Sequence, residues 1–120
     1  MEKKVLIADD ATFMRKMIKD VLTKEGFKVV GEAENGEEAV ELYKKFNPDL
    51  VTMDINMPGK DGIAAIEEIL NEDQQAQILI CSAIAELSTV SDVIGLGAKE
   101  FVAKPFQPKT ILKAVNGIFD

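Results

Sequence analysis

Acidic, hydroxyl and ammonium side chains follow several short apolar segments in this sequence. The pair Asp9-Asp10 follows Lys4–Ala8, Asp54 follows Leu50–Met53, Ser82 follows Ile78–Cys81 and Lys104 follows Glu100–Ala103. Three carboxylates brought close together repel one another, so a divalent cation is expected between them. All-oxygen ligation favours Mg²⁺, or Mn²⁺, over zinc. A metal beside Asp54 would neutralise incoming phosphoryl oxygens, with Lys104 as a second positive group, and one carboxylate could then attack phosphorus to form an aspartyl phosphate.

The elements that position these groups are predicted from the hydrophobic pattern. Apolar strand candidates alternate with helical patterns, and they cover Lys4–Ala8, Lys28–Gly31, Leu50–Met53, Ile78–Cys81 and Glu100–Ala103. This alternation predicts an α/β fold, a doubly wound parallel sheet covered by helices on both faces. In the flavodoxin-like strand order 2-1-3-4-5, the strands that carry polar ends are neighbours and the second strand is an edge. Ligands bind at the carboxyl ends of such strands.

Five helices are expected. They cover Thr12–Lys24, a segment from Asn35-Gly36 to Asn47-Pro48, a segment that opens at Asp61-Gly62, about Glu86–Leu96, and a last segment that begins near Pro108. In the first helix the predicted inner stripe is Phe13, Met14, Met17, Ile18, Val21 and Leu22, with Arg15, Lys16, Lys19 and Lys24 facing water. The helix over 86–96 contains poor helix formers and Gly95, so it is marginal and a candidate for movement.

Composition narrows the class of protein. The 120 residues fit one domain spanning 1–120, and 47% hydrophobic with 29% charged residues is ordinary for a globular protein. No apolar run is long enough to cross a membrane. The lone cysteine, Cys81, predicts a buried small side chain and a reducing, cytoplasmic setting. The absence of histidine removes the commonest general base, and a net charge of −7 argues against nucleic acid as a partner.

Each polar residue taken alone has a structural alternative. Asp9 or Asp10 could cap the first helix, Ser82 could be an ordinary loop hydroxyl, and Lys104 could be a solvated loop lysine. The combination is what favours a site, because all of these groups would have to converge at one edge of the sheet by accident.

The same residues resemble a known family. The set Asp9-Asp10, Asp54-Ile55-Asn56-Met57-Pro58, Asp61-Gly62, Ser82-Ala83 and Lys104-Pro105 resembles the receiver domains of two-component response regulators over essentially the whole chain. Within that family the likeness is strongest to the stand-alone receivers of chemotaxis. It rests on Asp10-Ala11-Thr12-Phe13-Met14-Arg15, Val51-Thr52-Met53-Asp54 and Ala103-Lys104-Pro105-Phe106-Gln107.

The resemblance implies a role for each motif residue. Asp54 would accept phosphate from a histidine kinase, and Mg²⁺ would be held by Asp9, Asp10, Asp54 and the backbone carbonyl of Asn56. Ser82 and Lys104 would contact the phosphoryl group. Phe101 would be the switch aromatic that responds to Ser82, although the family usually has tyrosine there. The peptide bond before Pro105 would be cis.

The resemblance also implies an output. Phosphorylation would rearrange the face formed by the helix over 86–96, the fifth strand and the last helix, with the flagellar motor switch protein as target. A monomer is expected, with a kinase as phosphodonor, a possible phosphatase, and no external substrate.

Two other functions stay open. One is a phosphorelay intermediate that passes phosphate to a histidine phosphotransfer protein. The other, less favoured, is a small aspartyl-phosphate phosphohydrolase. Such enzymes carry an Asp-x-Asp nucleophile and a cap domain, whereas the aspartates here are adjacent and no chain remains for a cap. A flavin or nucleotide carrier would need a glycine-rich loop after the first strand, where Asp9-Asp10 stand.

Overall fold

A single parallel sheet forms the centre of the molecule. The computed structural model describes residues 2–55, 57, 62–83, 95 and 97–119. Its strands are β1 (Lys4–Ala8), β2 (Lys28–Ala33), β3 (Leu50–Met53), β4 (Ile78–Ala83) and β5 (Glu100–Lys104). They lie in the order β2-β1-β3-β4-β5, so the predicted flavodoxin-like order is confirmed. The strands β2, β4 and β5 extend past their predicted ends.

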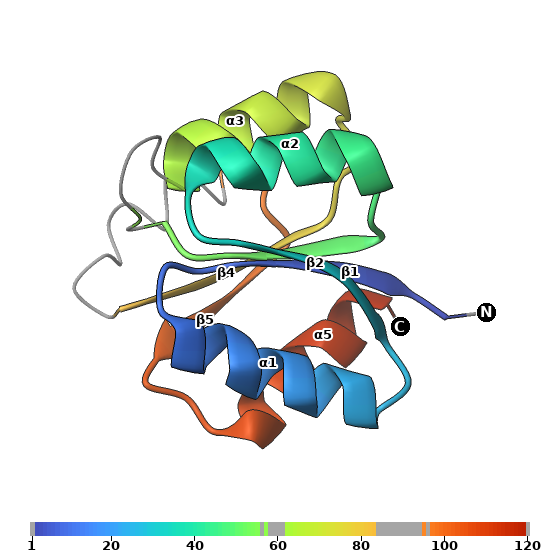
Figure 1. Ribbon diagram of the computed structural model, residues 1–120, viewed down its shortest axis with the longest axis vertical. Helices are drawn as coiled ribbons and strands as arrows, with labels where there is room; N and C mark the ends of the chain where they lie inside the picture. The colour runs from blue at the N-terminus through green and yellow to red at the C-terminus, as the bar shows by residue number, and fades with distance from the viewer. Residues whose placement is uncertain (1, 56, 58–61, 84–94, 96, 120) are drawn as a thin grey trace.

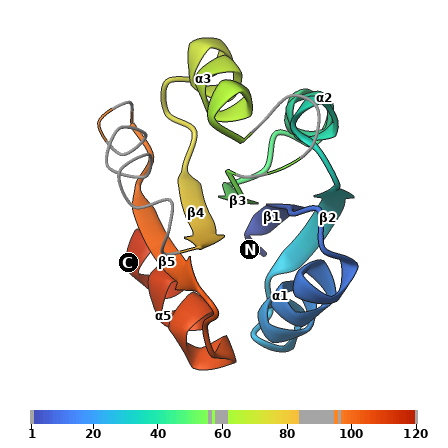
Figure 2. The same ribbon diagram turned by 90° about the vertical axis from the view of Figure 1, so that its left-hand side faces the viewer.

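Helices cover both faces of this sheet (Figure 1). The helices α1 (Thr12–Lys24) and α5 (Pro108–Phe119) lie on one face, and α2 (Gly36–Phe46) and α3 (Gly62–Glu72) lie on the other. Figure 2 shows the same three layers after a quarter turn. The helix expected over 86–96 falls, except for Gly95, outside the described residues.

Strand residues point alternately to the two faces and so build two cores. Val5 and Ile7 of β1 belong to the core under α1 and α5, whereas Leu6 and Ala8 belong to the core under α2 and α3. Because both faces are covered, the inner strands β1, β3 and β4 are near-continuous apolar runs, as parallel strands in such folds are. Cys81 is buried in the first of these cores as predicted, and burial raises the pKa of its thiol.

The residues predicted to begin and end α2 are found at its two ends. The Asn35 side chain accepts a hydrogen bond of 2.9 Å from the Glu38 amide, and Glu38 Oε1 accepts one of 2.8 Å from the Glu34 amide. The first bond satisfies an amide that the helix start leaves without a partner, and the second ties the residue before the cap to the first turn. At the other end Asn47 takes a left-handed conformation with φ 46°, and Pro48 follows.

Two predictions for α1 are wrong. Arg15, expected to face water, has a side chain only 7% exposed, and Phe13, expected in the inner stripe, is 74% exposed. The buried stripe runs through Met14, Ile18 and Leu22. At about 100° per residue, Arg15 lies roughly 60° around the helix from Ile18, whereas Phe13 lies roughly 140° away. Position on the helix therefore overrides residue type at both sites.

A hydrogen bond between side chains joins α2 to the end of α3. Tyr43 is 4% exposed, and its hydroxyl donates to Asp73 Oδ2 over 2.8 Å. Burial first, and then the hydrogen bond and charge of Asp73, raise the pKa of Tyr43 above its ordinary value of 10.0. The folded protein therefore holds this proton more tightly than the unfolded chain does.

Replacing Tyr43 with phenylalanine should lower the free energy of unfolding by about 1 kcal/mol at neutral pH, measured by urea denaturation. The contribution should be complete below the ordinary pKa of 10.0 and should fall as the pH rises beyond it, because the unfolded tyrosine ionises first. Tyr43→Phe should cost much less in an Asp73→Ala background. An equal cost in both backgrounds would show that the hydrogen bond contributes nothing.

Candidate functional site

Three carboxylates meet at the carboxyl ends of β1 and β3. These strands pair with Ala8 opposite Met53, so the residues that follow, Asp9 and Asp54, come side by side. The Asp54 amide donates to the Ala8 carbonyl over 2.9 Å, which anchors the start of the loop after β3 to β1. Asp9, Asp10 and Asp54 offer carboxylate oxygens that all lie within 4.8 Å of one another. Asp9 and Asp54 are buried, and Asp10 is exposed.

Lys104 places its ammonium between two of these carboxylates. Its Nζ lies 2.7 Å from Asp9 Oδ2 and 3.1 Å from Asp54 Oδ2. Burial alone would lower the pKa of Lys104, but the hydrogen bonds and charges of Asp9 and Asp54 outweigh it, and the pKa is raised. Lys104 therefore stays charged across the physiological range and compensates part of the negative charge.

Ser82 is the residue before the last in β4, at the same edge of the sheet. Its side chain is 1% exposed, and its Oγ has no hydrogen-bond partner among the described residues. A buried hydroxyl without a partner costs free energy, so this donor is available to a group that enters the site. Ser82 pairs with Ala103 of β5. Phe101, two positions before Ala103, is partly buried against the core under α2 and α3.

One further prediction for the site is confirmed, and two others concern residues that the structure does not describe. The Lys104–Pro105 peptide bond is cis, the isomer that the resemblance implied. Asn56, whose carbonyl was expected to ligate the metal, and Asp61, at the expected start of α3, lie outside the described residues.

Gly62, expected at the start of a helix and part of the Asp61-Gly62 motif, lies against the backbone of the site. Its amide donates to the Ile55 carbonyl over 3.1 Å. A Cβ at this position would collide with the carbonyl oxygen of Asp54 and with Cα of Ile55. Only glycine therefore lets α3 begin this close to the Asp54 backbone. The signal in the sequence was a glycine at the start of the helix that follows β3 and Asp54.

The donor set suits a hard divalent cation. All of the clustered ligand atoms are carboxylate oxygens, and such atoms are preferred by Mg²⁺ and Mn²⁺ over the softer transition metals. The ammonium of Lys104 against two of them shows that this place accommodates positive charge. The residues present thus fit a magnesium ion.

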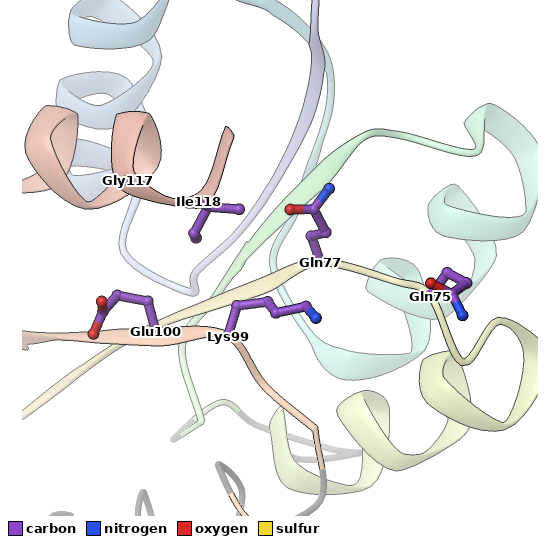
Figure 3. A pocket seen from close by; sticks show the side chains of 6 residues that line it. All are labelled: Gln75, Gln77, Lys99, Glu100, Gly117 and Ile118. Atoms are coloured by element: carbon purple, nitrogen blue, oxygen red, sulfur yellow. The ribbon is translucent and has the colours of Figure 1, made fainter. Parts of the chain in front are cut away.

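A separate hollow of about 400 Å³ lies at the opposite edge of the sheet (Figure 3). It is lined by Gln75, Gln77, Lys99, Glu100, Gly117 and Ile118, which include the residues just before β4 and at the start of β5. These side chains form no carboxylate cluster. The chemistry-bearing groups are therefore at the carboxyl ends of the strands, as in other open α/β sheets.

No helix among the described residues is long and apolar enough to cross a membrane.

Comparison with known proteins assigns the chain to a family. The response regulator receiver domain model matches residues 5–116. Chemotaxis protein CheY of Bacillus subtilis is 58% identical over 116 residues, which cover 97% of each chain. Chemotaxis protein CheY of Thermotoga maritima is 53% identical over 118 residues, which cover 98% of each chain.

A solved structure is similar in three dimensions as well. The CheX-CheY-BeF3-Mg complex from Borrelia burgdorferi gives a TM-score of 0.94 at 38% identity, and the match covers 98% of this chain and 90% of that chain. A family model that matches nearly the whole chain, together with relatives more than half identical, settles the classification. This chain belongs to the family of response regulator receiver domains.

Proposed function

We propose that this chain is a cytoplasmic, phosphorylation-activated response regulator of chemotaxis, in which Asp54 accepts a phosphoryl group from a histidine kinase. The observation that carries the proposal is the ammonium of Lys104 held 2.7 Å from Asp9 and 3.1 Å from Asp54, with Asp10 in the same cluster. The similar relatives named as chemotaxis proteins support the choice of pathway.

The proposed reaction is a transfer between a kinase histidine and Asp54. A carboxylate oxygen of Asp54 attacks phosphorus, the bond from phosphorus to the histidine nitrogen breaks, and its electron pair stays on the imidazole. The Lys104 ammonium, next to Asp54, stabilises the negative charge that arrives with the phosphoryl group. Transfers of this kind depend mainly on position and charge, so the absence of histidine from the chain is no obstacle.

The metal in this proposal is Mg²⁺. Asp9, Asp10 and Asp54, with the Asn56 carbonyl, would hold it, and it would supply further charge neutralisation for the phosphoryl oxygens. The Mg in the name of the similar Borrelia burgdorferi complex supports this choice of ion.

The proposed output follows from Ser82 and Phe101. A phosphoryl group on Asp54 gives the partnerless Ser82 hydroxyl an acceptor, and movement of Ser82 changes the space beside Phe101 on the neighbouring strand. The changed surface, which includes β5 and α5, binds the flagellar motor switch protein. The Borrelia burgdorferi complex holds CheX with a CheY protein, and a comparable partner, acting as a phosphatase, would reset this chain.

Incubation with acetyl phosphate and Mg²⁺ should add a single phosphoryl group, detected by intact-mass spectrometry. Asp54→Asn should abolish the addition, because an amide is not a nucleophile of this kind. The matched control is Asp20→Asn, which changes an exposed carboxylate on α1 that pairs with Lys16 over 3.3 Å. Undiminished labelling of Asp54→Asn would remove Asp54 from its proposed role.

Phosphorylation should raise affinity for the N-terminal peptide of the flagellar switch protein by at least about fivefold, the lower end of usual coupling between sites, measured by calorimetry. Lys104→Ala should reduce this gain more than it reduces phosphorylation, because Lys104 links the site to β5. Phosphorylation with no gain in peptide affinity would contradict the motor output and favour transfer to a histidine phosphotransfer protein.

A further inference from the structure

The guanidinium of Arg15 lies beneath the acidic site rather than in water. Its side chain is 7% exposed. Nη1 donates to the backbone carbonyl of Asp9 over 2.6 Å, Nε donates to Glu32 over 3.3 Å, and Nη2 donates to Glu34 and Thr12 over 3.3 Å each. One side chain thus joins the end of β1, the start of α1 and the end of β2.

The lengths of these bonds indicate that the guanidinium mainly holds the Asp9 carbonyl. The shortest bond goes to an uncharged carbonyl, whereas the two carboxylates are farther away and partly exposed, at 36% and 66% of their side chains. Ion pairs with exposed carboxylates contribute little to stability. Glu32 and Glu34 therefore serve to orient the buried guanidinium, and the guanidinium fixes the Asp9 carbonyl.

Every polar atom of Asp9 has a partner. Its amide donates to the Ala33 carbonyl over 3.0 Å, and its Oδ1 accepts from the Ala11 amide over 2.9 Å. Its Oδ2 accepts from Lys104 and its carbonyl accepts from Arg15. The carbonyl bond matters for the next residue too, because a planar peptide group links that carbonyl to the amide of Asp10. Holding the carbonyl orients the backbone from which Asp10 projects.

We propose that Arg15 is a positioning residue that preorganises Asp9 and Asp10 for Mg²⁺. This inference rests on the magnesium site of the proposed function. A simple electrostatic role would have the opposite effect, since removing a positive charge near an acidic site should tighten cation binding. Positioning predicts weaker binding when Arg15 is lost. The sign of the change therefore separates the two explanations.

The test is a calorimetric Mg²⁺ titration without any phosphodonor. Arg15→Met keeps the length of the buried stem and removes the guanidinium, and it should raise the Mg²⁺ dissociation constant about tenfold or more, as loss of a residue that orients metal ligands usually does. Arg15→Lys keeps the charge but has one ammonium in place of the three guanidinium nitrogens that donate here, so it should also weaken Mg²⁺ binding. The matched control is Lys19→Met, which removes a different ion pair to Glu32, at 3.5 Å, and leaves the Arg15 bond to the Asp9 carbonyl in place.

A second measurement separates positioning from general damage to the fold. With acetyl phosphate, the Mg²⁺ concentration for half-maximal phosphorylation should rise in Arg15→Lys by the same factor as the dissociation constant. The rate at saturating Mg²⁺ should stay unchanged, because the Arg15 hydrogen bonds within the described part of the chain go to Asp9, Thr12, Glu32 and Glu34 and not to the residues that meet the phosphoryl group.

The outcomes distinguish this inference from the proposed function. Asp10→Asn removes a ligand itself and should weaken Mg²⁺ binding in every case; if it does not, the magnesium site is wrong. If Asp10→Asn weakens binding while Arg15→Met or Arg15→Lys binds Mg²⁺ as tightly as the unaltered protein, only the positioning role of Arg15 is overturned. Circular dichroism checks that each variant is folded before titration. If Arg15→Met does not fold, the test uses Arg15→Lys alone.

Discussion

Repulsion among three carboxylates is the constraint on which this structure depends. Their oxygens lie within 4.8 Å of one another, two of the three residues are buried, and Lys104 bridges Asp9 and Asp54. A pair of like charges at 4 Å costs about 4 kcal/mol at an effective dielectric constant of 20, so the cluster persists only with positive charge in it. The doubly wound sheet supplies that charge, because its strand order brings the ends of β1, β3 and β5 to one edge.

Most of the fold could be predicted because its signals are local. Buried strands flanked by helical periodicity define the parallel sheet, and Asn35 and Pro48 mark the limits of α2. The gathering of Asp9, Asp54 and Lys104 could also be predicted, since parallel strands have their carboxyl ends at the same edge. The roles of these residues in phosphorylation do not follow from their positions alone and stay a proposal.

The parts that could not be predicted depend on contacts between distant segments. Arg15 was assigned to solvent because it is charged, yet its place about 60° from Ile18 turns it toward β2. Gly62 is part of a motif and a predicted helix start, but its closeness to the Asp54 carbonyl is visible only in three dimensions. Arg15 and Gly62 each lie against the backbone of an aspartate, Asp9 or Asp54, that the sequence did identify. The support around the site was therefore harder to predict than the site itself.

Localising the phosphoryl group tests the central claim most directly. Sodium borohydride reduces an acyl phosphate and leaves free carboxylates intact, so a phosphorylated aspartate becomes homoserine. Peptide mass spectrometry of the phosphorylated, reduced protein should find homoserine at position 54 and unmodified aspartate at positions 9 and 10. Homoserine at another position, or unreduced Asp54 in protein that carries a phosphoryl group, would contradict the account.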